Sequence, residues 1–212
     1  MISWIKKLIK LAHKFSSEAY WDNRYSKGGD SGPGSYGHLA KLKADIINSL
    51  ITEKGIISAI EFGCGDGNQL KYCNYQTYTG YDVSPTAINR CQEIFKTDPT
   101  KKFFLASQYD GRKADLAISL DVIFHLIEDD VFADYMENLF QAAGKLVIIY
   151  SSNQDDPIEP SSIHVKHRKF SNWIEAHQPT WNLTKHIANP YPYNGDSEMT
   201  SFADFHIYEK AE

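Results

Sequence analysis

The spacing of apolar residues predicts alternating helices and strands along the chain. Short apolar runs bounded by glycine or proline are typical of buried strands, and apolar residues recurring every three or four positions are typical of helices with one buried face. The clearest helical stripe covers residues 131–143, and we expect Gly144 to end it. The predicted strands cover residues 56–62, 77–83, 102–107, 114–120, 146–150, 181–187 and 201–208. The predicted helices cover residues 1–15, 39–51, 85–95 and 131–143, with a helix start at 66–73 and a further helix within 162–177.

Strands that alternate with helices predict an α/β fold, in which an open sheet is joined by crossover connections. The strands at 102–107 and 114–120 are so close in the chain that the helix of their crossover must be short or missing. A length of 212 residues suits one domain with appendages. We assign residues 1–37 to an N-terminal helix and a glycine-rich lid, and residues 38–212 to the domain itself.

The N-terminal part has two features that bear on function. Residues 1–15 combine scattered lysines with apolar residues at helical spacing, which fits a helix packed on the domain or a basic amphipathic helix on an anionic membrane surface. Five glycines fall between Gly28 and Gly37, and glycine leaves the backbone conformationally free. We call residues 20–38 the lid segment and expect it to be mobile.

Composition narrows the class of protein. Hydrophobic residues make up 42% of the chain and charged residues 23%, as in ordinary globular proteins. No run of about 18 apolar residues is present, so we expect no membrane-spanning helix. The net charge of −5 disfavours a nucleic-acid partner, because proteins that bind nucleic acid electrostatically are basic. The three cysteines are an odd number without the CxxC spacing of metal sites, so we expect no metal and a reducing, cytoplasmic setting.

The sequence AIEFGCGDG, residues 59–67, carries the strongest functional signal. An acid, Glu61, ends a buried strand, and a turn with Gly63, Gly65 and Gly67 follows. These glycines let the backbone approach a ligand closely at the carboxyl end of the strand. A dinucleotide site requires Gly-x-Gly-x-x-Gly, whereas here the third glycine comes one residue early. The spacing therefore opposes a Rossmann oxidoreductase and fits S-adenosylmethionine, which has no pyrophosphate.

Acidic residues also end the second and fourth predicted strands. Asp82, followed by Val83, stands where a carboxylate can accept hydrogen bonds from both hydroxyls of a ribose. Asp121 ends the strand in the sequence SLDVIFHL, and His125 follows four residues later. Together with the glycine turn, these acids predict a ligand site at the carboxyl ends of the strands.

These motifs resemble those of the class I S-adenosylmethionine-dependent methyltransferases, over roughly residues 20–208. The resemblance implies a Rossmann-like sheet of seven strands, six parallel and the seventh antiparallel, with helices on both faces and an N-terminal helical lid. It also implies S-adenosylmethionine as the cofactor. The glycines of residues 63–67 would then lie against its methionine and ribose portions, and Asp82 would hold the ribose hydroxyls.

The same resemblance assigns the other cofactor contacts. Ser107 and Gln108 would lie beside the adenine, where many members of the family carry an acid, and Asp121 and Val122 would face the methionine. The predicted cofactor-binding residues are Tyr20, Arg24, Glu61, Gly63, Gly65, Gly67, Asp82, Val83, Ser107, Gln108, Asp121 and Val122.

A more specific resemblance precedes the glycine-rich stretch. Residues 20–25, YWDNRY, look like the N-terminal YWDxRY element of some small bacterial methyltransferases, including ones from surface-polysaccharide gene clusters. In relatives this element closes over the cofactor, and an arginine pairs with the cofactor carboxylate. The resemblance implies that role for Arg24, because a guanidinium matches a carboxylate in two hydrogen bonds. A surface helix end is the alternative interpretation.

A basic run, HVKHRK at residues 164–169, suggests the nature of the methyl acceptor. Five potentially cationic side chains in six residues of an acidic protein favour an anionic acceptor, such as a phosphate- or nucleotide-linked sugar, although a solvated surface fits the same pattern. A hydroxyl acceptor needs a base, and the candidates in order are His164, His167, His125 and Asp121. The predicted acceptor-binding residues are Tyr36, His38, His164, His167 and Arg168.

The sequence therefore predicts a cytoplasmic enzyme of polysaccharide biosynthesis that methylates an oxygen of a small anionic molecule. N-methylation of another substrate class and a non-catalytic cofactor-binding module stay open as alternatives. The complete glycine turn opposes the second alternative, because a scaffold has no need of it.

Overall fold

The computed structural model describes residues 15–158 and 162–211. The helix predicted over residues 1–15 lies outside this range except for its last residue. Among the helices that are described, none is long and apolar enough to cross a membrane.

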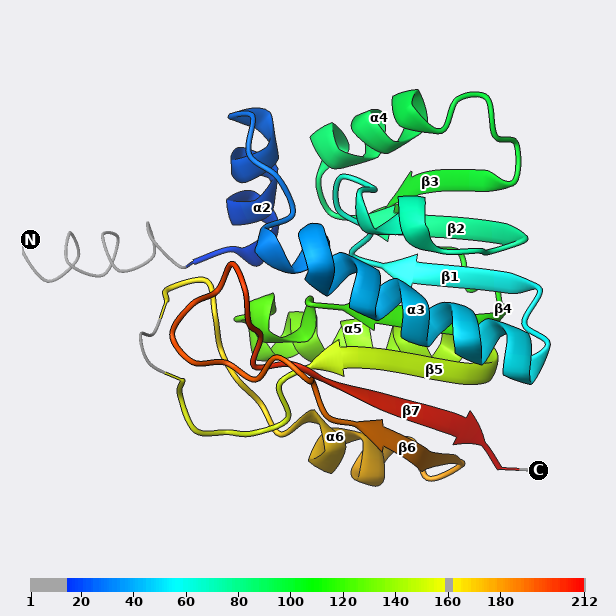
Figure 1. The fold of residues 1–212 in the computed structure, drawn as a ribbon, viewed down its shortest axis with the longest axis vertical. Helices are drawn as coiled ribbons and strands as arrows, with labels where there is room; N and C mark the ends of the chain where they lie inside the picture. The colour runs from blue at the N-terminus through cyan, green and yellow to red at the C-terminus, as the bar shows by residue number, and fades with distance from the viewer. Residues whose placement is uncertain (1–14, 159–161, 212) are drawn as a thin grey trace, which may run out of the picture.

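A seven-stranded sheet forms the centre of the molecule (Figure 1). Its strands are β1 Ser58–Phe62, β2 Thr77–Asp82, β3 Lys101–Leu105, β4 Ala114–Leu120, β5 Ala143–Ser151, β6 Trp181–Ile187 and β7 Asp204–Lys210. Their spatial order is β3-β2-β1-β4-β5-β7-β6, and β7 pairs antiparallel with both β5 and β6. Six strands run one way and β7 runs the other way, which confirms the predicted sheet.

Helices cover both faces of this sheet (Figure 1). They are α2 Ser17–Ser26, α3 Gly37–Lys54, α4 Pro85–Ile94, α5 Asp129–Ala142 and α6 Phe170–His177. Side chains of α3 and α4 join one buried cluster with the sheet, and side chains of α5 and α6 join another on the opposite face. Helix α2 stands at the edge to which the arrowheads of β1 and β5 point, so it lies beside the carboxyl ends of the parallel strands.

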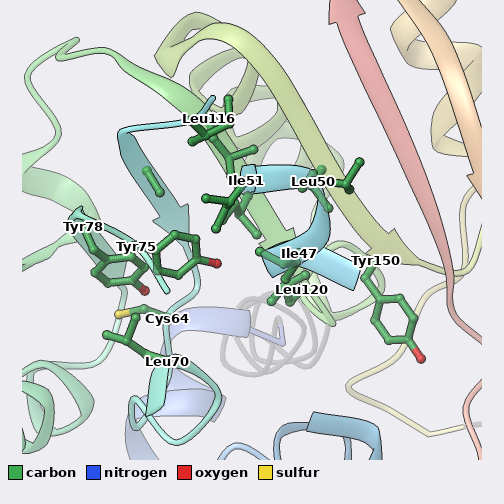
Figure 2. Close-up of a cluster of buried hydrophobic side chains, with 14 of the residues drawn as sticks. Ile47, Leu50, Ile51, Cys64, Leu70, Tyr75, Tyr78, Leu116, Leu120 and Tyr150 are labelled. Carbon is green, nitrogen blue, oxygen red and sulfur yellow. The ribbon is translucent and has the colours of Figure 1, made fainter. Parts of the chain in front are cut away.

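The core on the α3 side holds that helix against the middle of the sheet. Figure 2 shows Ile47, Leu50 and Ile51 of α3 beside Leu116 and Leu120 of β4. All five side chains are buried, and burial of apolar surface is the main favourable contribution to folding. This packing places the first turns of α3 close to the strand ends that carry the acidic motifs.

The buried face of α3 differs from the predicted one. The sequence pattern predicts a face that includes Leu42 and Ile46, but both residues are only half-buried. The structure instead buries Leu39, Ala40, Lys43, Ala44, Ile47, Leu50 and Ile51. The helix is therefore rotated relative to the prediction, and Lys43 occupies an inward position of an otherwise apolar face.

One predicted helix start is only a short turn, and the helix predicted within residues 162–177 is present as α6. The helix start predicted at 66–73 is a 3₁₀ turn, η2 Gln69–Tyr72, because Gly67 has a φ of 76° that breaks helical geometry. The helix predicted within 162–177 begins only at Phe170, so the basic run lies in a loop.

Several predicted boundaries also move. Strand β3 ends at Leu105, and the short crossover contains only η3 Ala106–Gln108, which holds Ser107 and Gln108 in a turn. Strand β7 begins at Asp204 rather than at residue 201. Gly144 does not end a helix, since α5 leads directly into β5. A Cβ at Gly144 would lie 3.0 Å from the carbonyl oxygen of Ala114, so glycine here permits close pairing of β5 with β4.

Candidate active site

A cavity of about 210 Å³ lies at the carboxyl ends of β1, β2 and β4, next to α2. Ligands of open α/β sheets bind at this edge. Of the predicted site residues, the cavity is lined by Glu61, Gly63, Gly65, Asp82, Val83, Asp121, Val122 and His125. Residues outside the predicted set that line it include Trp21, Tyr25, Ser31, Gln69, Tyr81, Ala106, Glu128 and Tyr135. The structure thus brings the glycine turn and the acids of three strand ends into one place.

Other predicted residues lie outside this cavity. They are Tyr20, Arg24, Tyr36, His38, Gly67, Ser107, Gln108, His164, His167 and Arg168. Gly67 serves packing instead, because a Cβ there would lie 2.9 Å from the sulfur of Cys91 on α4. Ala106, the neighbour of Ser107, contributes to the lining in its place.

The glycine turn after β1 requires glycine at two positions of the cavity wall. Gly63 has a φ of 81° and Gly65 a φ of 56°, a region that side chains other than glycine rarely adopt. A Cβ at Gly63 would collide with Val122, and one at Gly65 would collide with the hydroxyl of Ser31. The bare backbone therefore lets the strand end, the β4 loop and the lid segment meet closely.

Asp82 presents a buried carboxylate at the end of β2. Its Oδ2 accepts a hydrogen bond from the backbone N–H of Gly65 at 2.9 Å, and its Oδ1 accepts one from Ser84 at 2.9 Å. Burial raises the pKa of Asp82 to about 6, against the opposite effect of these hydrogen bonds. A carboxylate has about four lone-pair sites, so acceptor capacity is left for a ligand in the cavity.

Glu61 is a second buried carboxyl group in the cavity wall. The Tyr78 hydroxyl donates a hydrogen bond to its Oε2 at 2.6 Å. Burial raises the pKa of Glu61 from 4.5 to about 7, so the folded protein favours the protonated form.

This shift predicts a pH-dependent stability. The stabilising contribution of Glu61 to the free energy of unfolding is fully present below pH 4.5 and is lost as the pH rises through about 7. The reason is that the carboxyl group of Glu61 loses its proton at a lower pH in the unfolded chain than in the folded protein. The free energy of unfolding of the wild type should therefore fall relative to that of Glu61→Gln over this range. Urea unfolding at several pH values measures it, with the exposed Glu93→Gln as control. A difference between wild type and Glu61→Gln that does not change with pH would contradict the assignment.

The lid segment is hydrogen-bonded to the glycine turn through Asp66. The Oδ2 of Asp66 accepts a hydrogen bond from the backbone N–H of Ser31 at 3.0 Å and another from the Tyr36 hydroxyl at 2.7 Å. In return, the Asp66 N–H donates to the Ser31 hydroxyl at 3.0 Å. The Asn68 side chain donates to the carbonyl of Ser35 at 2.7 Å. The predicted acceptor residue Tyr36 thus contacts the turn after β1.

Arg90 of α4, which belongs to none of the sequence motifs, makes a further connection to this segment. Its guanidinium donates to the carbonyls of Gly29 at 2.6 Å and Tyr25 at 2.5 Å, and it lies 5.8 Å from the centre of the Tyr25 ring. At the N-cap of α4, the Ser84 hydroxyl donates to Asp22 at 2.7 Å. Helix α4 therefore holds both the end of α2 and the loop that follows it.

Replacing Arg90 by alanine should loosen the lid segment and leave the rest of the fold intact. Two charge-assisted hydrogen bonds, each worth about 1.5–3 kcal/mol gross, would be lost. We expect faster amide hydrogen exchange in residues 25–31 and weaker binding of S-adenosylhomocysteine. Lys96→Ala, which removes an exposed cation just after α4, is the control. Equal protection of residues 25–31 in Arg90→Ala and wild type would show that this connection is not needed.

The aromatic residues of α2 contact histidines of two loops. The rings of Tyr20 and His164 stack at 4.6 Å, and the ring of Trp21 meets the ring of His125 edge-on at 4.7 Å. Arg24 pairs with Asp30 of the lid segment at 3.0 Å. The predicted pairing of Arg24 with a cofactor carboxylate stays a prediction.

His125 has a defined tautomer. Its Nδ1 lies 2.8 Å from the carbonyl oxygen of His164. A carbonyl oxygen only accepts, so Nδ1 carries the hydrogen and the lone pair of the neutral ring is on Nε2. Burial lowers the pKa of His125 to about 3, which keeps the ring neutral at physiological pH. The cavity therefore contains an uncharged imidazole whose acceptor nitrogen, Nε2, receives no hydrogen bond from the described residues.

Asp121 lies at the end of β4 in a strained backbone conformation. Its φ of 59° is positive, and among the described residues no other non-glycine residue shares this feature. Its Oδ2 accepts from the ammonium of Lys43 at 2.5 Å. The side chain of Lys43 is 1% exposed, and its ammonium lies 5.2 Å from the centre of the Tyr150 ring. A carboxylate of the cavity wall is thus paired with a buried cation.

The basic run has partners of its own. Lys166 and Arg168 both pair with Asp129, at 2.5 Å and 2.7 Å. The Arg168 guanidinium also donates to the carbonyls of Leu126 and Ile127. These contacts fix the loop before α5, so the predicted role of Arg168 in acceptor binding stays a prediction.

The remaining predicted acceptor residues make internal contacts. His167 is bonded to the Ser152 hydroxyl at 2.7 Å, and His164 to the Ser162 hydroxyl at 2.6 Å. His38 is bonded to the carbonyl of Met199 at 2.9 Å.

The groups that line the cavity match the polar and apolar parts of S-adenosylmethionine. The cavity offers carboxylates for hydroxyls, bare glycine backbone, and apolar walls such as Val83 and Val122. Two residues of the cavity wall, Gln69 and Tyr81, have a buried side-chain oxygen with no hydrogen-bond partner among the residues described. Within residues 15–158 and 162–211, no three His, Cys, Asp or Glu side chains are placed to hold a metal ion.

Comparisons with known proteins agree with this fit. A family model described as methyltransferase domain matches residues 36–191. Among curated proteins, the small RNA 2'-O-methyltransferase of Arabidopsis thaliana is 26% identical over an alignment of 136 residues, which covers 55% of this chain and 14% of that protein.

Solved structures share the fold. Magnesium protoporphyrin IX methyltransferase from Synechocystis PCC 6803, with bound S-adenosylmethionine, superposes with a TM-score of 0.61 at 13% identity, covering 93% of this chain and 99% of that one. A small RNA methyltransferase superposes with a TM-score of 0.62 at 17% identity, covering 82% of this chain and 25% of that one.

Proposed function

The chain belongs to the methyltransferase domain family and is a class I S-adenosylmethionine-dependent methyltransferase, and from this premise we propose that it methylates a hydroxyl oxygen, with His125 as the base. The bound cofactor supplies an electrophilic methyl group on its sulfonium. The protein has to hold the acceptor oxygen in line with that group, exclude water and take the hydroxyl proton.

The observation that carries the proposal is the tautomer of His125. Its Nδ1–H is bonded to the carbonyl of His164, which orients the ring and leaves the Nε2 lone pair to accept a proton. The proton of the acceptor hydroxyl moves to Nε2 while the oxygen bonds to the methyl carbon. His125 also lines the same cavity as Asp82 and the glycine turn.

The other candidate bases are less well placed. His164 and His167 lie outside the cavity and are bonded to serine hydroxyls through Nδ1. Asp121 lines the cavity, but one of its oxygens is committed to Lys43. The structure therefore favours an order that begins with His125 rather than with His164.

For the acceptor we propose a phosphate- or nucleotide-linked sugar, as found in precursors of surface polysaccharides. The basic run supports an anionic molecule, although Asp129 neutralises part of its charge. A ribose hydroxyl of RNA is a second candidate, because a similar protein is a small RNA 2'-O-methyltransferase. The net charge of −5 opposes it, since RNA binding favours basic surfaces.

Methyl transfer to defined probes tests both candidates. The wild-type protein is incubated with S-adenosylmethionine and either UDP-glucose, a sugar phosphate or a short RNA duplex, and mass spectrometry locates the added methyl group. We expect a methyl ether on a sugar hydroxyl of a nucleotide- or phosphate-linked sugar. Transfer only to RNA would favour the second candidate, and a methyl group on nitrogen would overturn O-methylation.

A further inference from the structure

The sequence of residues 1–15 has a strict division between apolar and polar positions. When successive residues are placed about 100° apart, as on a helical wheel, every apolar residue falls in one half of the circle and every polar residue in the other. Lysines on one side with Trp, Leu and Phe on the other are typical of segments that bind a membrane surface. The apolar half contains Met1, Ile2, Trp4, Ile5, Leu8, Ile9, Leu11, Ala12 and Phe15, and the polar half contains Ser3, Lys6, Lys7, Lys10, His13 and Lys14.

The charge of the chain is divided between this segment and the rest. Residues 1–14 carry four lysines and no acid, and the first acid of the sequence is Glu18. The whole chain has a net charge of −5, so taking away these four positive charges leaves −9 for residues 15–212. An anionic surface therefore attracts residues 1–14, whereas the net charge of the remaining chain opposes binding.

The structure shows where this segment joins the domain. Helix α2 begins at Ser17, whose N–H and hydroxyl donate to the carboxylate of Glu128 at 2.9 Å and 2.5 Å. Ser16 and Ser17 line the cavity, so the chain enters the domain at the wall of the cavity. Binding of residues 1–14 to a membrane would therefore hold the cavity close to that membrane.

An exposed apolar side chain lies near this entry point. The ring of Phe15 lies 5.7 Å from that of Tyr20, which in turn stacks on His164 at 4.6 Å. Ile163, next to His164 in the chain, is 77% exposed, more than any other large hydrophobic side chain of the described residues. The domain thus presents an apolar group to solvent beside the residue that follows the basic segment.

We propose that residues 1–14 bind the surface of an anionic membrane, with Ile163 inserted beside them. The apolar half would enter the boundary between headgroups and acyl chains, and the lysines would lie at the lipid phosphates. The proposal goes beyond the proposed function and does not depend on the identity of the methyl acceptor.

Sedimentation with vesicles tests the proposal on the full chain. Vesicles of equal parts of phosphatidylglycerol and phosphatidylcholine should carry the wild type into the pellet, and vesicles of phosphatidylcholine alone should not. Partitioning onto the anionic vesicles should fall about 10²–10³-fold when the four lysines are replaced together by glutamine, because each lysine near such a surface contributes about fivefold. These substitutions are Lys6→Gln, Lys7→Gln, Lys10→Gln and Lys14→Gln.

Matched variants make the result specific. A control variant loses four exposed lysines of the domain instead, which changes the net charge equally and should leave vesicle binding intact. Ile5→Asn combined with Leu8→Asn keeps the charge but interrupts the apolar half, so this variant should lose binding as well. Ile163→Ser should weaken binding about tenfold, as expected for one apolar side chain. The control substitutions are Lys41→Gln, Lys96→Gln, Lys102→Gln and Lys113→Gln.

Each contrary outcome has a distinct meaning. Wild type that stays in the supernatant with both kinds of vesicle, or a four-lysine variant of residues 1–14 that binds like the control variant, would overturn the proposal. Binding of a short RNA duplex in place of vesicles, lost with the four lysines but kept in the Ile5→Asn and Leu8→Asn variant, would assign the segment to nucleic acid. A lower melting temperature of that variant, with no sedimentation of the wild type, would mean that the segment packs on the domain. Unchanged binding in Ile163→Ser would remove this residue from the membrane surface.

Discussion

Replacing His125 by glutamine is expected to lower kcat by about 10²–10⁴-fold and to leave the affinity for S-adenosylhomocysteine nearly unchanged. Glutamine can still donate its amide to the carbonyl of His164, so the loop keeps its shape. It has no basic nitrogen, so it cannot take the proton of the acceptor hydroxyl. Steady-state kinetics with saturating cofactor, together with calorimetric titration of S-adenosylhomocysteine, measure the two quantities.

The neighbouring histidines provide the control for this result. His164→Gln and His167→Gln should keep kcat close to that of wild type, because their rings lie outside the cavity. Since the pKa of His125 is lowered to about 3, the kcat of wild type should persist well below pH 6.5 before this group is protonated. A loss in His164→Gln as large as that in His125→Gln would sink the assignment of the base.

Replacing Asp82 by alanine is expected to weaken cofactor binding at least about tenfold, because the two hydrogen bonds that we propose from ribose hydroxyls to this charged acceptor would be lost. The structure adds a second reason, since Asp82 also orders the glycine turn through Gly65. Affinity of the wild type should rise as the pH passes about 6, where Asp82 ionises. Calorimetric titration of S-adenosylhomocysteine at several pH values tests both expectations.

The exposed Asp110 is the matched control for this variant. Its carboxylate pairs with Arg112 at the surface, so Asp110→Ala should bind the cofactor like wild type. Thermal unfolding of both variants shows whether the fold is intact. An affinity of Asp82→Ala equal to that of wild type would remove Asp82 from the ribose site.

The sequence was informative about the sheet because strand and helix patterns are local. Apolar runs mark β1 and β5, and the glycine spacing locates the turn after β1. The rotation of α3 was missed because Leu42 and Ile46 look like core residues, while the true face contains two alanines and Lys43. The sequence does contain a signal for the inward position of Lys43. This residue lies four positions after Leu39 and four before Ile47, a spacing that places all three on one face of a helix.

The site was predictable where its residues end strands, and less so where distant residues meet. Asp82, Asp121 and His125 follow strand ends, and all three line the cavity. The sequence showed no acidic partner next to the basic run, but in the structure Asp129 of α5 pairs with both Lys166 and Arg168. The spacing of residues along the chain does not predict ion pairs between distant segments. The contact of Arg90 with the lid segment could not be predicted for the same reason.

A crystal structure of the wild-type protein with S-adenosylhomocysteine bound would test most directly whether this cavity is the site of methyl transfer. The account predicts the ribose hydroxyls on Asp82 and the sulfur on the side of the cavity lined by His125. A ligand bound in this cavity with its sulfur away from His125, or bound elsewhere on the protein, would contradict it.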